Sequence, residues 1–385
     1  MDVWWLAPVV LGLFALFAVA NPVIQVLVRR ARVRRGGPGT APWLALGARL
    51  GLAPDLDLGV TSWRTRLAGV RDSHRVQLDF ELAGERGTIR DPKDERHFTT
   101  SARVTLRIPL PAGLLIQHAR HHGVAAQVLG VAGVRVGVSH LEDLLRVRCD
   151  DARALRELFD HEGLQRAFFE EFSLRPGAEV SSTAVTFRVR SSSADRAAEL
   201  MQEALDFAAI LEDAVADLLR GWVAARGLVV DAEPVAEAWV ATGMVRGLFV
   251  RVTASGQRTT VSVSLPLDAP EGLRMRAVEG EGEGEGEGEG AGEREAGEGG
   301  AVVLHNPLFS RLIAVWADDP ELAAERLREM PTETVLAVLK GHPSARVADG
   351  QVSIPLVGLP GAALLEEVID DAVALACGLG ILELA

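Results

Sequence analysis

The chain has 385 residues, of which 40 are basic and 53 acidic, and its formal net charge is −13. Domains commonly hold ~100–200 residues, so this length predicts about two of them. Hydrophobic residues make up 48% and charged residues 24%, which excludes a largely disordered chain or a coiled coil. Two cysteines far apart in the sequence, Cys149 and Cys377, exclude a disulfide framework and a cysteine-based zinc site.

The charge is unevenly distributed along the chain. Residues 279–298 contain nine Glu and one Arg, so they hold −8 of the −13. Five arginines follow one another closely near the N-terminus, namely Arg29, Arg30, Arg32, Arg34 and Arg35. The remaining residues are mildly acidic and show no basic stripe, so we expect no nucleic-acid partner.

An N-terminal apolar segment predicts a membrane anchor. Residues 4–28 contain no charged side chain, and this length suffices to cross the hydrocarbon core of a bilayer with some tilt. Trp4 and Trp5 lie at one end, where indole rings favour the membrane interface. The alternatives are a signal peptide cleaved near Ala18-Val19-Ala20 and a buried soluble helix. No positive charge precedes the apolar run, which continues past that cleavage site, so we expect a transmembrane helix with flanking arginines over residues 1–35.

The arginine cluster also predicts the orientation of this helix. Arginines resist translocation, so the end of the helix that they follow should stay in the cytoplasm. The residues before Trp4 include the acidic Asp2 and can cross easily, which places the N-terminus outside and the body in the cytoplasm. The preference for Arg over Lys is typical of GC-rich bacterial genomes, so we expect a single-pass protein of the bacterial inner membrane, with the lipid bilayer as a partner.

The body of the chain shows an internal duplication. Residues 42–214 and 215–385 carry the same succession of motifs, with a period of about 170 residues, which is too long for a solenoid. The main matches are Trp43 with Trp222, Trp63 with Trp239, Val76 and Leu78 with Val250 and Val252, Ile108-Pro109-Leu110 with Leu265-Pro266-Leu267, Gly113-Leu114 with Gly272-Leu273, Asp150-Asp151 with Asp318-Asp319, Val185-Thr186-Phe187 with Val352-Ser353-Ile354, and Ala197-Ala198 with Ala362-Ala363.

Each copy is predicted to be an α+β domain, with an antiparallel sheet covered by helices. An opening helix precedes a hairpin, a third strand and a fourth strand that ends at the Asp pair. Two short helices, a second hairpin and a closing helix follow. In the second copy, Asp349-Gly350 between alternating apolar residues predicts a tight hairpin turn, since both residues need positive φ. The closing helices carry apolar residues at i, i+3 and i+4, which suits a helix that covers a sheet.

The copies differ most between their third and fourth strands. The first copy has a segment from His118 to Val138, whereas the second has the Glu-Gly run, residues 279–300. This run has no apolar face, so we expect a disordered insertion that acts as a solvated spacer. The alternative is an acidic tether for a basic partner or for divalent cations.

Candidate catalytic and metal-binding motifs have simpler structural explanations. Asp151 and Asp319 directly precede predicted helices, which indicates N-caps rather than acid–base groups. His118, His121 and His122 have the spacing of one helical face, which could bind zinc, but no carboxylate or Cys is close by and an exposed polar loop is favoured.

The other motifs give no stronger indication of a binding site or of catalysis. Residues 358–361, Gly-Leu-Pro-Gly before a helix, could bind an anion through backbone N–H groups but are typical of a turn. The chain contains no Walker A, Gly-x-Ser-x-Gly or kinase signature. We therefore expect no cofactor, no metal and no catalytic residue, and we lean against an enzyme.

The combination of an anchor and duplicated domains predicts a binding or scaffolding module. Its partner would be an unknown protein or a second copy of the chain, bound through the face between the two domains. Two alternatives stay open: a membrane-tethered enzyme with its site in a cleft of one copy, and a module that binds a lipid or another apolar ligand between sheet and closing helix.

Overall fold

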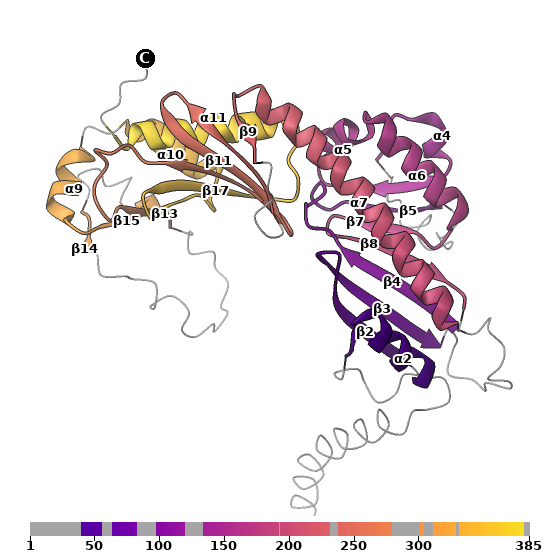
Figure 1. Cartoon of the computed structure of the whole chain (residues 1–385). Coiled ribbons are helices and arrows are strands. Elements are labelled where there is room, and N and C mark those ends of the chain that lie inside the picture. Colours follow the sequence, from indigo (N-terminus) through magenta and orange to yellow (C-terminus); the bar gives the residue numbers. More distant parts are fainter. Residues whose placement is uncertain are drawn as a thin grey trace, which may run out of the picture. The chain divides into compact units, whose positions relative to one another are not determined.

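A computed structural model of the chain describes residues 40–55, 64–82, 98–119, 134–191, 193–231, 238–278, 300–303, 311–328 and 331–380 (Figure 1). These residues form two antiparallel sheets and eight helices, which confirms the predicted α+β class. None of the helices in these ranges is long and apolar enough to cross a membrane. The predicted anchor, with Trp4, Trp5 and the five arginines between 29 and 35, lies outside the described residues.

The first sheet has the strand order β1-β2-β3-β4-β8-β7-β5-β6. On its core face Leu67, Leu78, Ala102 and Phe187 are successive cross-strand partners, and all four are buried. The strands are β1 (Ala53–Pro54), β2 (Arg64–Arg71), β3 (His74–Leu82), β4 (Phe98–Thr105), β5 (Leu115–His118), β6 (Leu145–Arg148), β7 (Glu179–Ser181) and β8 (Ala184–Val189).

Five helices belong to the same part of the chain: α2 (Thr40–Leu50), α4 (Ser139–Glu142), α5 (Ala152–Phe159), α6 (Glu162–Leu174) and α7 (Ala194–Ala224). Two of these helices pack on the sheet through stacked aromatic rings. The ring of Trp43 on α2 stacks on that of Phe80, with 4.7 Å between the ring centroids. The ring of Phe207 on α7 stacks on that of Phe187, with 5.8 Å between the centroids. These contacts bury large apolar surfaces on one side of the sheet.

Helix α7 is longer than the sequence pattern predicts. The closing helix of the first segment and the helix around Trp222 were expected to be separate, but they form one continuous helix. Its second half contains no Pro, and the single Gly221 costs a helix only about 1 kcal/mol, so nothing in the sequence ends the helix there. The expected segment border at residues 214/215 therefore lies inside α7.

The second sheet has the strand order β14-β15-β13-β16-β17-β12-β11-β10-β9. On its core face the cross-strand partners Val250, Val263 and Val352 are fully buried. The strands are β9 (Val229–Val230), β10 (Trp239–Val245), β11 (Leu248–Ser255), β12 (Arg258–Ser264), β13 (Arg274–Ala277), β14 (Gly300–Ala301), β15 (Ile313–Ala317), β16 (Arg346–Ala348) and β17 (Gln351–Val357).

Three helices accompany the second sheet: α9 (Pro320–Arg326), α10 (Thr332–Gly341) and α11 (Ala362–Gly378). Helix α11 packs against β11, β12, β17 and α10, so it covers one face of the sheet as its apolar spacing predicts (Figure 1). The predicted hairpin turn is also confirmed, because Asp349 and Gly350 have φ values of 53° and 72°.

The chain divides into two compact units. One comprises the described residues up to Thr105 together with Glu171–Glu179 and Ala184–Ala209. The other comprises Leu106–Glu170, Val180–Thr183 and the described residues from Ile210 onward. The second sheet and the helices that accompany it thus lie wholly within the latter unit.

Candidate functional site: an arginine face on the second sheet

The second sheet has a core face and an outer face, because successive residues of a strand point to opposite sides. Val250 and Val263 are partners on the core face, and both are buried. The next residues along the strands, Arg251, Ser262 and Ser353, are cross-strand partners on the outer face. These outer positions are exposed or half-buried, so polar side chains occupy them.

Five arginines lie on this outer face, and we call them the arginine face: Arg251 on β11, Arg258 on β12, Arg274 and Arg276 on β13, and Arg346 on β16. Three of them belong to one row of cross-strand partners, Arg251–Ser262–Ser353–Arg346–Arg276, which crosses five adjacent strands. Neighbouring strands lie ~4.8 Å apart, so this row extends about 19 Å.

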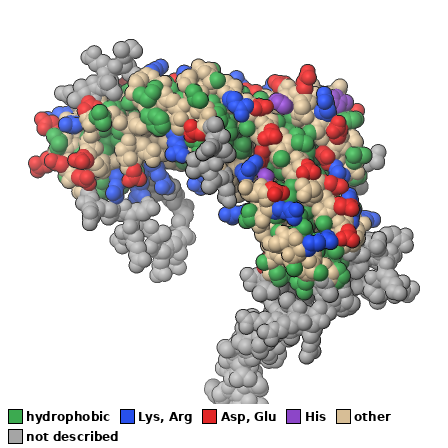
Figure 2. All heavy atoms as spheres, in the orientation of Figure 1, with side chains coloured by type: hydrophobic (Ala, Val, Ile, Leu, Met, Phe, Trp, Pro, Cys, Tyr) green, Lys and Arg blue, Asp and Glu red, His purple; other side chains and the backbone are tan. Residues whose placement is uncertain are grey.

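Within the strands of the second sheet that the structure describes, no acidic residue balances the positive charge of the arginine face. The strands of the second sheet contain no Asp or Glu, four of the arginines are exposed and Arg274 is half-buried. Within the described ranges none of the five forms an ion pair. Figure 2 shows Arg and Lys side chains in blue on the side of this sheet opposite α10 and α11. A concentrated positive surface has therefore formed on a chain whose net charge is −13.

Apolar side chains lie among these arginines. Phe249 is 45% exposed and Met244 60%, and the two are cross-strand partners. Val357 is 75% exposed and pairs with Arg258. Trp316 lies under the guanidinium of Arg276, 5.4 Å from ring centroid to Cζ, in a cation–π contact. The face can thus meet a ligand that offers both negative charge and apolar surface.

Two arginines on the outer face of the first sheet are paired with carboxylates. Arg66 donates to Asp79 at 2.8 Å and lies 3.5 Å from Asp55, and the hydrogen bond to Asp79 raises the pKa of Arg66. Arg188 likewise donates to Glu179 at 3.2 Å. Arg75, Arg103 and Arg148 of this sheet are exposed and have no ion pair within the described residues. The second sheet differs in that its strands contain no Asp or Glu at all, so none of its arginines has an acidic neighbour within the sheet.

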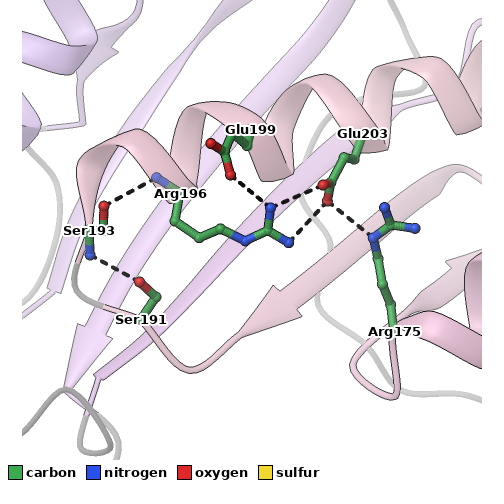
Figure 3. A network of polar contacts seen from close by, with 6 residues as sticks. All are labelled: Arg175, Ser191, Ser193, Arg196, Glu199 and Glu203. Atoms are coloured by element: carbon green, nitrogen blue, oxygen red, sulfur yellow. Dashed lines mark hydrogen bonds and ion pairs between the residues drawn. The ribbon is translucent and has the colours of Figure 1, made fainter.

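A second polar cluster joins Arg175, directly after α6, to Arg196, Glu199 and Glu203 of α7, and its opposite charges pair with one another (Figure 3). Arg196 donates to Glu199 at 2.9 Å and to Glu203 at 3.0 Å, and Arg175 donates to Glu203 at 3.1 Å. Burial on its own raises the pKa of Glu203, but the hydrogen bonds from Arg175 and Arg196 outweigh it, so this pKa lies below its usual value. The cluster fastens the end of α6 to the start of α7, where Ser193 also accepts from the backbone N–H of Arg196.

The Asp residues before the helices are N-caps, as predicted. Asp151 accepts hydrogen bonds from the backbone N–H groups of Arg153 and Ala154 at 2.8 and 3.0 Å. Asp319 accepts from the N–H of Leu322 at 3.0 Å. These carboxylates satisfy N–H groups that the first turn of a helix leaves free.

The Asp residues that precede these caps occupy matching corners of the two sheets. Asp150 lies beside Gly113, which has φ +65°, and Asp318 lies beside Gly272, which has φ +64°. A Cβ on Gly113 would lie 2.1 Å from Asp150 Oδ2, and a Cβ on Gly272 would lie 2.2 Å from Asp318 Oδ1. Both corners therefore require glycine for two reasons, the left-handed backbone and the close carboxylate.

The turn at residues 358–361 was considered as an anion site, but the carboxylate of Glu157 already lies beside it. Helix α11 starts at Ala362, and the N–H of Ala362 donates to Glu157 Oε2 at 2.7 Å. The N-terminus of a helix favours negative charge, which Glu157 of α5 supplies. A side chain of the protein thus occupies the position that a bound anion would need.

The histidines do not form the expected group. His118 is the last residue of β5, pairs with Leu145 and is buried, so the prediction of an exposed loop is wrong for this residue. His121 and His122 lie outside the described residues. His161 Nδ1 accepts from the backbone N–H of Leu164 at 3.2 Å and so caps the first turn of α6. In the described part of the chain, no group of three or more His, Cys, Asp or Glu is placed to hold a metal ion.

Cys377 is buried and Cys149 is half-buried. Burial raises the pKa of Cys149 and of Cys377. Cys149 Sγ also lies within hydrogen-bond distance of the backbone oxygen of Asp151, at 3.2 Å. A raised pKa keeps a thiol protonated and weakly nucleophilic at neutral pH.

Comparisons with known proteins add little. No family model matches the chain, and no curated protein matches it. A solved structure with some similarity is that of the mycobacterial trehalose monomycolate transport factor A, TtfA, at 11% identity and a TM-score of 0.31. The similarity covers 44% of this chain and 96% of that one. At this TM-score it carries no argument about the function of the chain.

The arginine face was missed in the sequence, where we expected no basic stripe. Its arginines are spread from Arg251 to Arg346, and the fold brings them together only through pairing between distant strands. A usable signal was present at Arg251, which occupies a polar position of a predicted strand that contains no acid. Arg274 and Arg276 lie on β13, a strand of four residues that the sequence pattern did not predict.

Proposed function

We propose that the chain is a single-pass, membrane-anchored binding or scaffolding module made of two copies of one α+β domain. Its arginine face would bind an anionic partner. The observation that carries this proposal is a set of five arginines on an outer sheet face, none of which has a carboxylate partner among the described residues, in a chain that is acidic overall. Unpaired, exposed arginines suit the recognition of carboxylates and phosphates, which accept paired hydrogen bonds from a guanidinium.

The order of the strands supports the duplication. If each strand of the first sheet is replaced by its counterpart, the order β1-β2-β3-β4-β8-β7-β5-β6 becomes β9-β10-β11-β12-β17-β16-β13-β15. This is the order of the second sheet read from its other end, with β14 as an added edge strand. Unrelated domains would rarely share eight strands in one such order.

Local geometry supports the same relationship. The Gly113–Asp150 corner has its counterpart in Gly272–Asp318. The first hairpin turns also correspond, since residues 72–73 and 246–247 all have positive φ. Identical turn conformations at equivalent places favour a common ancestral domain over two similar folds.

The proposed alignment shifts one of the sequence matches. Pro111 and Pro270 each accept a hydrogen bond from the N–H of the third residue after them, which makes these two prolines counterparts. The sequence motifs instead matched Pro109 with Pro266, and that match is shifted by two residues from the alignment of Pro111 with Pro270. The shift arises because both loops contain a second proline.

The anchor and its orientation remain part of the proposal. They are supported by the uncharged residues 4–28, by Trp4 and Trp5, and by the arginines from Arg29 to Arg35. A reporter that is active only in the cytoplasm, fused to the C-terminus, should be active, and deletion of residues 4–28 should release the chain from membranes. Reporter activity only outside the cytoplasm would contradict the proposed inner-membrane topology.

A crosslinking experiment tests the binding surface. A photo-crosslinking residue at Thr253, on the outer face of β11, should give a crosslinked product in cells, whereas one at the exposed Lys340 of α10 should not. Arg251→Gln with Arg346→Gln should reduce the product formed from position 253. Equal products from both positions, or a product that the Arg→Gln changes leave intact, would contradict binding at the arginine face.

A further inference from the structure

The arginine face combines two properties that one class of partner would use together. Four of its five arginines are exposed, and none has a carboxylate partner within the described residues. The exposed Phe249, Met244 and Val357 lie on the same face of the sheet, on β11 and on the neighbouring strands β10 and β17. Trp316 lies there too, beneath Arg276. A bilayer of anionic lipid offers phosphate groups for guanidinium side chains and an interface in which aromatic rings are favoured.

We propose that the arginine face is a docking surface for the anionic phospholipid headgroups of a bilayer. This inference rests on the proposed membrane anchor, which would keep the face close to such a surface and raise its effective concentration there. The row from Arg251 to Arg276 runs about 19 Å across the sheet, so several headgroups would be bound at once.

The Glu-Gly run is the other occupant to consider. Residues 279–298 carry −8 and directly follow β13, so their charge complements the arginine face. Glutamate and glycine, however, offer no apolar surface to Phe249, Met244 and Val357. A lipid interface accounts for the apolar residues as well as the arginines, so we favour it.

Vesicle sedimentation tests the inference on the full chain. The chain is held by its anchor in nanodiscs of phosphatidylcholine and mixed with sedimenting vesicles of phosphatidylcholine, with or without phosphatidylglycerol. It should sediment only with the phosphatidylglycerol vesicles, and added salt should weaken this binding. Arg251→Gln/Arg276→Gln/Arg346→Gln should weaken it about 100-fold, since each arginine near an anionic surface contributes about fivefold.

A matched control variant removes the same amount of positive charge from a part of the surface outside the arginine face. Arg148, Arg166 and Arg190 are exposed and lie off the second sheet, so their combined change to Gln should leave vesicle binding nearly intact. Equal losses in the two triple variants, or equal sedimentation with both kinds of vesicle, would overturn the inference. Thermal unfolding of each variant checks that its fold is retained.

Three further outcomes separate this inference from its rivals. Vesicle binding that appears only after the nine glutamates of residues 279–298 are changed to Gln would assign the face to that run and overturn lipid docking. Tighter binding to a DNA duplex than to the vesicles would overturn it in favour of nucleic acid. A chain that stays outside the nanodiscs would contradict the anchor, and its free form would still test the face with the same vesicles.

Discussion

Glu157 on α5 accepts a hydrogen bond from the backbone N–H of Ala362, the first residue of α11, at 2.7 Å. The two residues are far apart in the sequence, and α11 is the helix that covers the second sheet. Gly361, at the N-cap, has no side chain to do this, so the carboxylate of a distant helix caps α11 instead. The start of α11 therefore depends on a contact with a helix that lies 205 residues earlier in the sequence.

Removing this cap should destabilise α11. Glu157→Ala should lower the free energy of unfolding by about 1 kcal/mol, because it removes both a hydrogen bond and a charge that suits the helix dipole. Urea denaturation of the full chain in detergent measures this loss, and hydrogen exchange should quicken in the first turn of α11. Arg153→Ala, which removes only the exposed partner of Glu157, should cost less than about 0.5 kcal/mol. Equal losses for the two variants would contradict the capping role.

The caps of the short helices should behave alike in the two halves of the chain. Asp151→Ala and Asp319→Ala should each lower the free energy of unfolding by about 1 kcal/mol, because each leaves helix N–H groups without an acceptor. Thermal unfolding gives the measurement, and Asp213→Ala, at an exposed position within α7, serves as the control with a change within about 0.5 kcal/mol. A neutral Asp151→Ala would contradict the proposed equivalence of the caps.

The two glycine corners make a sharper comparison. Gly113→Ala and Gly272→Ala should each cost more than about 2 kcal/mol, since the new Cβ meets a carboxylate and the backbone is left-handed. Gly137 has φ +80° but open space around it, so Gly137→Ala isolates the backbone strain at about 1 kcal/mol. If all three variants lost the same stability, the close carboxylates would have no effect and the corner argument would be wrong.

Much of the fold could be predicted because its signals are local. Alternation of apolar residues identified β11 and its partners, since the core face of a strand repeats every two residues. Asp319 before Pro320 and Asp349-Gly350 before a strand act within one turn of the chain, so short sequence windows contain all of their information.

The arginine face and the long helix depended on information that short windows lack. Arg251 and Arg276 share a row only because β12, β17 and β16 lie between their strands, and a strand order is a property of the whole chain. Helix α7 continues through residues 214/215 because nothing there ends a helix, whereas the repeat pattern had suggested a border. His118 was misassigned because the alternation of β5 covers only four residues.

The polar cluster of Figure 3 should make the free energy of unfolding depend on pH, through the carboxyl group of Glu203. The pKa of Glu203 is lowered in the folded chain, so its ionised form stabilises the fold. That contribution is present above the unfolded pKa of about 4.3 and is lost as the pH falls from there through the folded pKa. Glu203→Gln should therefore flatten the fall in stability below about pH 4.3, as measured by urea denaturation at a series of pH values. Glu199→Gln, whose side chain is 63% exposed, should flatten it much less, and an unchanged pH dependence in Glu203→Gln would contradict this role.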